Sequence, residues 1–312
     1  MKTELCDLLG TEFPVIVGAM AHITDGEFAG KVSEAGALGV LTAGLKGADY
    51  VKEQVAIARS ITNKPFAVNI IMESPIAHEA AQACIDEKVE FVTISAGNPE
   101  KIVPLLAEAG IKTICLIPHV RGAKKMEALG ASALVAEGME GGGHIGKMCT
   151  MPMVRQVADA VDIPVIAAGG IADGKGILAS MMLGAVGVQM GTAFLVADEC
   201  PISDLYKQLI IEAADTSTTL TGEPGEKQVR CIANPFTEEY WRLYHAGASS
   251  QELMDYCTGS ISRAKAGDLE RGAFSAGMIS GLITERKSIR GILENLNRDM
   301  DESYAAFKKL YG

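Results

Sequence analysis

The sequence predicts an α/β fold, a TIM (β/α)8 barrel with a smaller, mostly helical cap inserted late in the chain. Eight short apolar runs recur within about the first 200 of its 312 residues, and amphipathic stretches the length of one helix separate them. The runs are almost continuously apolar, as strands of a parallel sheet covered by helices are. An open doubly wound sheet is the alternative arrangement of the same units.

The expected strands are these apolar runs in chain order. They cover residues 14–20, 36–44, 65–71, 91–97, 112–118, 133–138, 164–170 and 187–195. The stretches between them, from DGEFAGKVSEAG to DGKGILASMMLG, each match one crossover helix. Most of the expected strands end in small or polar residues, and in a barrel these ends meet on the face where ligands bind.

The regular alternation stops after about residue 200. Residues 201–270 combine a polar helix, a Thr-rich piece and the aromatic patch FTEEYWRLYH, and we expect them to form a substrate-binding cap over the barrel mouth. Residues 276–283 and a helix from Ser288 to Tyr311 return to core-like spacing, so we expect them to close the barrel. The barrel domain then consists of residues 1–200 and 271–312.

Composition limits the function. The formal charge is −11 and no dense Lys/Arg run occurs, which argues against nucleic-acid binding. No run of about 18 apolar residues and no signal-like N-terminus is found, so we expect a cytoplasmic protein without membrane contact. The seven cysteines are scattered without zinc-ligand spacing, which predicts reduced thiols and no metal site.

The stretch EGMEGGGHIG at residues 137–146 contains the pattern GxGxxG. A dinucleotide fingerprint belongs after the first strand of a βαβ unit and needs an acidic residue at the end of the next strand. In this chain the pattern follows the sixth expected strand. Asp162 precedes the seventh strand and so lies at its amino end, whereas the fingerprint needs the acidic residue at the carboxyl end. The dinucleotide interpretation is therefore weak.

The alternative is a backbone cradle for a flat ligand. Gly141, Gly142 and Gly143 can adopt positive φ and allow close approach, which holds His144 over that ligand. A histidine there can transfer a proton at neutral pH or donate a hydrogen bond to a developing oxyanion. An exposed loop histidine without a role is the third interpretation.

An anion site is predicted at the ends of the last two strands. Gly169 and Gly170 end the seventh strand, Asp173 can cap the following helix, and Gly191 and Thr192 end the eighth. Glycine amides and a threonine hydroxyl beside a helix N-terminus form the phosphate site that recurs in these barrels. Plain tight turns are the alternative.

A phosphate site beside the histidine loop suggests a phosphorylated planar cofactor. Flavin mononucleotide (FMN) fits this description. Pyridoxal phosphate is disfavoured because no strand end offers a lysine for a Schiff base, and Lys147 is the only near candidate.

The sequence resembles the superfamily of FMN-dependent nitronate monooxygenases and enoyl-[acyl-carrier-protein] reductases II, and residues 137–176 resemble the reductase branch most. The segments that carry the resemblance are GAMAHITDGEFAGKVSEAGALGV, PFAVNII, SAGNP, EGMEGGGHIGKMCTMPMVRQVADAVDIPVIAAGGIADGKG, VQMGTAF and AGMISGL. The resemblance implies a TIM barrel that binds FMN, takes electrons from NADH or NADPH, and reduces the trans-2 double bond of an enoyl thioester on acyl carrier protein in fatty acid biosynthesis. It also implies a homodimer and stimulation by a monovalent cation.

The resemblance also assigns site residues, with His144 as the catalytic residue. The residues implied to bind the cofactor are Ala19, Met20, Asn69 and Ser95 beside the flavin ring, Glu137, Gly143 between ring and substrate, and Gly169, Gly170, Gly191 and Thr192 at the phosphate. Two positions depart from the family pattern. His22 replaces an aromatic residue, and Met278 replaces a glutamine.

An acidic carrier protein requires local basic residues on this acidic chain. Lys46, Arg263, Lys265 and Arg271 are the expected docking residues near the mouth. Two rival functions stay open. One is a nitronate monooxygenase that uses FMN and O2, and the other is a barrel isomerase or lyase that acts on sugar phosphates without redox chemistry.

Overall fold

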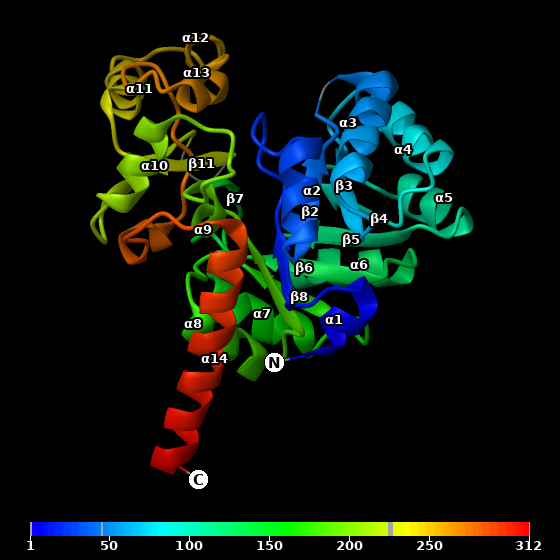
Figure 1. Cartoon of the computed structure of the whole chain (residues 1–312). Coiled ribbons are helices and arrows are strands. Elements are labelled where there is room, and N and C mark those ends of the chain that lie inside the picture. The colour runs from blue at the N-terminus through cyan, green and yellow to red at the C-terminus, as the bar shows by residue number, and fades with distance from the viewer. Residues whose placement is uncertain (1, 45, 224–226, 312) are drawn as a thin grey trace.

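A closed barrel of eight parallel strands forms the centre of the molecule (Figure 1). The structure is a computed structural model, and it describes residues 2–44, 46–223 and 227–311. The strands are β1 Val15–Val17, β2 Leu38–Thr42, β3 Phe66–Ile71, β4 Phe91–Ser95, β5 Lys112–Ile117, β6 Ala133–Glu137, β8 Val165–Ala168 and β9 Gly187–Met190. Each lies inside one of the eight predicted runs. Because β9 pairs with β1, with Ile16 opposite Gln189, the sheet has no edge and the open-sheet alternative is excluded.

Helices follow the strands and cover the barrel. They are α2 Gly26–Glu34, α3 Gly47–Ile61, α4 Ala77–Asp86, α5 Ile102–Glu108, α6 Val120–Ala128, α7 Thr150–Ala158 and α8 Gly174–Met182. Short polar side chains begin two of them: Asp25 accepts from the N–H of Phe28, and Asp173 accepts from the N–H of Gly176, each at 2.9 Å. The predicted capping role of Asp173 is confirmed.

The continuous apolar runs are explained by burial on both faces of the sheet. Leu38, Phe91 and Ile166 belong to a cluster inside the barrel, while Val68 and Val188 face a larger cluster under the helices. Leu5 and Leu9 of α1 (Glu4–Leu9) join the interior cluster. Helix α1 therefore closes the end of the barrel that holds the amino ends of the strands.

The barrel does not close as the sequence predicted. The last strand ends at Met190, and Thr192–Leu195 forms the short helix α9. Residues 276–283 contain the 3-10 helix η1 (Met278–Leu282) and no strand. Helix α14 (Ile289–Tyr311) packs on the outside of the barrel against α8. The two helices are so close that a Cβ added to Gly174 of α8 would lie only 2.2 Å from the backbone nitrogen of Met300. Strand β9 closes the sheet, and α14 belongs to the surrounding helical layer.

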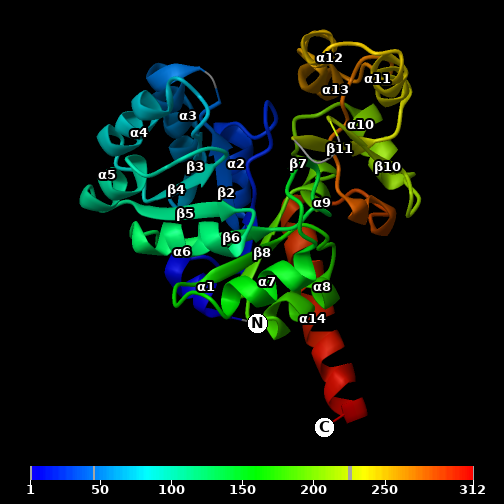
Figure 2. The ribbon, with the colours of Figure 1, turned by 180° about the vertical axis from the view of Figure 1, so that it is seen from behind.

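The segment after α9 contains strands as well as helices (Figure 2). Its elements are α10 Asp204–Ile211, β10 Thr218–Thr221, β11 Gln228–Ile232, α11 Pro235–His245, α12 Ser250–Cys257 and α13 Ser260–Ala266. A further short strand, β7 (Gly143–Ile145), leaves the barrel and pairs antiparallel with β11, which gives the sheet order β10-β11-β7. This pairing attaches the histidine segment, β7, to the segment after α9. No helix in the described ranges is both long and apolar enough to cross a bilayer.

Candidate active site

The predicted site residues lie at or just beyond the carboxyl ends of the barrel strands, on the face opposite α1. They are Ala19 and Met20 after β1, Asn69 in β3, Ser95 at the end of β4, Glu137 at the end of β6, Gly169 and Gly170 after β8, and Gly191 and Thr192 after β9. Contacts across the mouth bring some of them together. A Cβ on Gly191 would lie 3.7 Å from Sδ of Met20.

The backbone after β8 and β9 presents unpaired donors. Gly169 and Gly170 have φ of 90° and 75°, a region that favours glycine. The N–H groups of Gly170 and Gly191 donate to no acceptor in the described part of the chain. Thr192 Oγ1 accepts from the N–H of Gly277 at 2.9 Å, which leaves its own hydrogen available. This arrangement fits an anion such as the phosphate of FMN.

A polar network lies deeper in the barrel, near the ends of β3 and β4. Asn69 is buried, and its Nδ2 donates to Thr93 Oγ1 at 3.0 Å and to Ser95 Oγ at 3.3 Å. These bonds fix the rotamer of Asn69 and leave Ser95 partly accessible at the mouth. Such a fixed amide and hydroxyl suit hydrogen bonding to the polar edge of a flat ring.

Glu137 is a partly buried carboxyl with no hydrogen bond or ion pair to any described residue. Burial raises the pKa of Glu137 to about 7, because removal from water disfavours its charged form. A Cβ on Gly141 would lie 3.8 Å from Glu137 Oε1, so the carboxyl lies against the glycine loop. At neutral pH this group therefore keeps a substantial protonated fraction.

The glycine loop is held by residues that the sequence analysis missed. Both carboxylate oxygens of Glu140 accept from the N–H of Thr150, at 3.0 and 2.9 Å. The buried guanidinium of Arg230 in β11 donates to the carbonyl oxygen of Met139 from Nε at 3.3 Å and from Nη2 at 3.2 Å. Glu140 is ten residues away from Thr150, the first residue of α7, and Arg230 lies on a distant strand, so no local pattern marks either contact.

The prediction of positive φ holds only for Gly143, at 78°. Gly141 and Gly142 do not adopt positive φ. Gly142 is required for another reason, because its Cβ would lie 2.7 Å from the carbonyl carbon of Ala276. The loop is thus packed closely against residues 276–277 and is not a freely flexible cradle.

His144 lies on β7, opposite Val229 of β11, rather than on a loop. Its imidazole is exposed and makes no hydrogen bond within the described residues. Desolvation by surrounding protein lowers the pKa of His144, the charge of Lys227 lowers it further, and Glu73 opposes this effect. A lowered pKa means that the neutral imidazole predominates at neutral pH.

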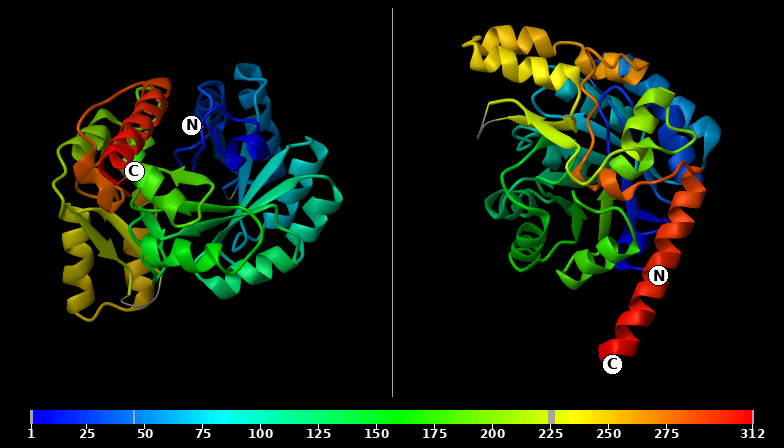
Figure 3. Two further views of the ribbon diagram at one scale, coloured as in Figure 1. Left: turned by 90° about the horizontal axis from the view of Figure 1, so that it is seen from below. Right: turned by 90° about the vertical axis from the view of Figure 1, so that its left-hand side faces the viewer.

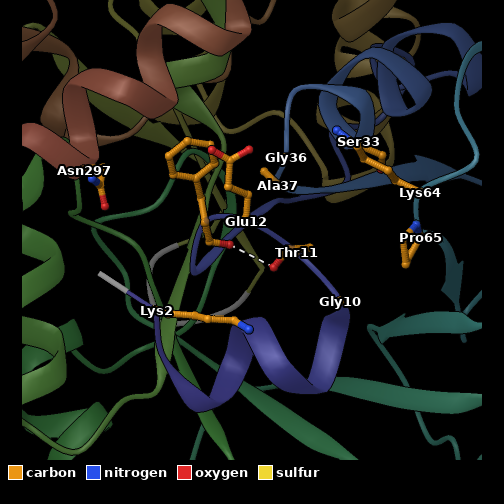
Figure 4. A pocket seen from close by; sticks show the side chains of 11 residues that line it. Lys2, Gly10, Thr11, Glu12, Ser33, Gly36, Ala37, Lys64, Pro65 and Asn297 are labelled. Carbon is orange, nitrogen blue, oxygen red and sulfur yellow. Dashed lines mark hydrogen bonds between the residues drawn. The ribbon is translucent and has the colours of Figure 1, made fainter.

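A cavity of about 600 Å³ lies at the opposite end of the barrel, before β1, β2 and β3 (Figure 4). Its two lysines already have partners: Lys2 pairs with Asp7 at 3.0 Å and Lys64 with Glu34 at 3.7 Å. Thr11 in its wall donates to the carbonyl oxygen of Phe13. We therefore place the site at the mouth and not in this cavity.

The family model described as nitronate monooxygenase matches residues 2–85 and 78–299 of this chain. The chain belongs to the nitronate monooxygenase family. A probable nitronate monooxygenase of Staphylococcus saprophyticus is 33 % identical over 303 residues, which cover 82 % of this chain and 84 % of that protein.

Solved structures of the family extend the comparison. FabK from Thermotoga maritima is 39 % identical, covers 99 % of both chains and has a TM-score of 0.96. A nitroalkane oxidase from Streptomyces ansochromogenes is 28 % identical, covers 97 % of this chain and 99 % of its own, and has a TM-score of 0.86. The barrel fold of this family member is therefore shared along its whole length.

The two residues expected to depart from the family pattern, His22 and Met278, have definite places. His22 adopts φ of 62°, and its carbonyl oxygen accepts from Lys265 Nζ at 2.9 Å. Met278 donates its backbone N–H to the carbonyl oxygen of Glu140 at 3.0 Å, while its side chain is 48 % exposed. The contact of Met278 with the glycine loop does not depend on its side chain.

Among the expected docking residues, Arg263 and Lys265 lie on α13, Arg271 follows that helix, and Lys46 directly precedes α3. Arg263 of α13 donates to the carbonyl oxygens of Arg271 and Thr258, and Lys46 lies 4.4 Å from the ring centroid of Tyr50. Within the described ranges, none of Lys46, Arg263, Lys265 and Arg271 forms an ion pair. Their charges are therefore available to an acidic partner.

Proposed function

We propose that this chain is an FMN-dependent enoyl-acyl carrier protein reductase of fatty acid biosynthesis, which reduces the trans-2 double bond of enoyl thioesters with NADH or NADPH. The observation that carries the proposal is the 39 % identity to FabK, an enoyl-acyl carrier protein reductase II, over 99 % of both chains. The identity to the nitroalkane oxidase is 28 %, and to the probable nitronate monooxygenase 33 %.

The residues at the mouth fit FMN. The N–H groups of Gly170 and Gly191, which donate to no described residue, and the hydroxyl of Thr192 suit the phosphate. Asn69 and Ser95 suit the polar edge of the ring, and Met20 supplies an apolar contact close to Gly191. Gly143, Gly169 and Ala19 leave room for close approach, as residues without bulky side chains do.

Bound FMN supplies hydride transfer between the nicotinamide and the enoyl thioester. The protein must then stabilise charge on the thioester oxygen and supply a proton to the α-carbon. We assign the first role to His144, because its lowered pKa keeps the imidazole neutral with one N–H to donate. Glu137, whose pKa is raised to about 7, is the second group that holds a proton at neutral pH, and we assign it the proton supply.

Anaerobic spectroscopy of the FMN-loaded protein tests this function. NADH or NADPH should bleach the flavin absorbance, and a short trans-2-enoyl thioester should then restore it without oxygen. A flavin that stays oxidised with both nicotinamides but consumes O2 with an alkyl nitronate would assign the monooxygenase reaction instead. A purified protein that takes up no FMN would refute both.

For the carrier protein, we propose docking on Arg263, Lys265, Arg271 and Lys46, because none of them forms an ion pair with another described residue. Reversal of the charge of Arg263 and Arg271 should raise KM for carrier-bound substrate and leave KM for a short free thioester unchanged. Equal KM values for the carrier-bound substrate before and after reversal would exclude this surface.

A further inference from the structure

A second cavity, of about 310 Å³, lies at the mouth of the barrel, where the loops after β3 and β4 leave the sheet. The residues that line it are Met72, His78, Asn98, Glu100 and Lys101. The two loops directly follow the strands that carry Asn69 and Ser95, which we assign to the polar edge of the flavin ring. The cavity is therefore next to the proposed flavin site, and none of its lining residues has a role in that site.

The two loops are tied to each other, so the cavity is formed before any ligand binds. The N–H of Met72 donates to the carbonyl oxygen of Ser95 at 2.9 Å. The N–H of Glu73 donates to the carbonyl oxygen of Ala96 at 3.1 Å. Gly97 has φ of 106°, and a Cβ there would lie 2.9 Å from Cβ of Met72. A ligand that enters such a preformed cavity loses little binding free energy to ordering of the protein.

The charges at the cavity favour an anion. Glu100 is its acidic lining residue, and Lys125 already pairs with it at 3.3 Å. Asn98 holds this pair in place, because its Oδ1 accepts from Lys125 Nζ at 3.0 Å and its Nδ2 donates to Glu100 Oε2 at 3.2 Å. Lys101 is exposed and forms no ion pair with another described residue. A free ammonium group beside a neutralised acid suits a phosphate.

The size and the apolar wall of the cavity indicate more than a single ion. Its volume is at the low end of the range of about 300–1,000 Å³ for small-molecule sites, which suits part of a nucleotide. Met72 contributes a flexible, polarisable side chain, and such side chains contact aromatic rings favourably. The cavity therefore combines a place for phosphate with a place for a base.

We propose that this cavity binds the adenosine diphosphate part of the nicotinamide dinucleotide, with Lys101 at its phosphates. This inference rests on the proposed reductase function, in which a nicotinamide must reach the flavin ring from nearby. The position of the cavity beside Ser95 meets that need.

The phosphate of a carrier-bound thioester is a less suitable occupant. We assign carrier docking in part to Arg263 and Lys265 of α13. Figure 1 and the left-hand view of Figure 3 show α4 and α5 on the opposite side of the molecule from α11, α12 and α13. The loops that form the cavity lead into α4 and α5, so a carrier held at α13 approaches the mouth from the other side.

Calorimetric titration of the FMN-loaded protein with ADP-ribose, which lacks the nicotinamide, tests the proposal. We expect a Kd below about 1 mM for the wild type. Lys101→Glu should raise this Kd about tenfold, because a favourable charge contact becomes an unfavourable one. Lys309→Glu makes the same charge change near the end of α14, which Figure 1 shows projecting away from the barrel, and should leave the Kd unchanged.

Steady-state kinetics give a second measurement. Lys101→Glu should raise KM for NADH or NADPH by a similar factor and leave KM unchanged for a short enoyl thioester that carries no phosphate. A wild-type protein that does not bind ADP-ribose, or a Kd that Lys101→Glu does not change, would overturn the proposal. A rise in KM confined to the carrier-bound thioester would also overturn it and assign the cavity to the phosphate of that substrate.

The two proposals fail in different ways. Failure of both NADH and NADPH to bleach the flavin would refute the proposed function. Normal bleaching without binding of ADP-ribose would refute only the assignment of this cavity.

Discussion

His144 is the residue on which the proposed chemistry depends most. Its imidazole has no partner in the described chain and lies beside the glycine loop. Removal of one oxyanion donor typically costs about 2.7–4 kcal/mol of transition-state stabilisation. We therefore expect His144→Ala to lower turnover by two orders of magnitude or more, and to leave the Kd for FMN within about threefold of wild type. Normal turnover in this variant would exclude His144 from the reaction.

The ion pair between Lys227 and Glu73, at 2.8 Å, affects His144 electrostatically. Lys227 lowers the pKa of His144 and Glu73 raises it. Lys227→Ala should therefore raise the pKa, and Glu73→Ala should lower it. Titration of the histidine ring by NMR measures both changes. Lys124→Ala on helix α6 is the control, because Lys124 is not among the charges that shift the pKa of His144. Shifts of the same sign in the first two variants would contradict this account.

Glu137 makes the stability of the unliganded protein depend on pH. Its folded pKa of about 7 is above the value of 4.5 for a free side chain. The folded protein therefore holds this proton more tightly, and the resulting stability is complete below about pH 4.5 and lost as the pH rises through 7. Glu137→Gln avoids burial of the charge.

We expect Glu137→Gln to raise the free energy of unfolding at pH 8 by up to about 3 kcal/mol, and to change it little at pH 5. Urea titrations of the FMN-free protein at the two pH values measure this difference. Glu302→Gln at the exposed end of α14 is the control. An equal effect at both pH values would show that Glu137 is not the titrating group.

At the level of elements, the sequence predicts the barrel strands well because they are buried on both faces. Short, continuously apolar runs such as VIAA at residues 165–168, bounded by proline and glycine, indicate strands of this kind. Strand β7 has only the residues Gly143, His144 and Ile145, and its partner β11 lies far along the chain, with Ile145 opposite Gln228. No local pattern indicates such a pairing, so the histidine segment was expected to be a loop.

Gly142 shows how tightly this loop is packed. A Cβ there would meet the backbone of Ala276 at 2.7–2.8 Å, so either the loop or residues 276–277 must move. We expect Gly142→Ala to destabilise the protein by about 1–3 kcal/mol, as overpacking does. Gly146→Ala is the matched control, because its Cβ would meet only Pro118 at 3.5 Å and the carbonyl oxygen of Glu137 at 3.9 Å. Equal melting temperatures for the two variants would show that the loop accommodates the methyl group.

For the whole molecule, topology explains which site residues sequence reasoning can find. Asn69, Ser95, Gly170 and Gly191 lie at or just beyond the ends of parallel strands, and closure of the barrel brings those ends to one face. Arg230 reaches the same face from β11, outside the barrel. The contact of Arg230 with the glycine loop depends on how the segment after α9 packs on the barrel. That packing is fixed by strand pairing between distant parts of the chain.

The proposed phosphate site predicts how the whole molecule responds to cofactor removal. A ligand at about 100 times its Kd stabilises the folded state by about 2.7 kcal/mol, which corresponds to a shift of several degrees in Tm. Riboflavin has the same ring but no phosphate, so it has no group to accept from the N–H groups of Gly170 and Gly191, which donate to no described residue. At equal concentration, FMN should therefore raise the Tm of the apoprotein clearly more than riboflavin does. Differential scanning calorimetry compares the two ligands directly, and equal shifts would mean that the strand ends hold no phosphate.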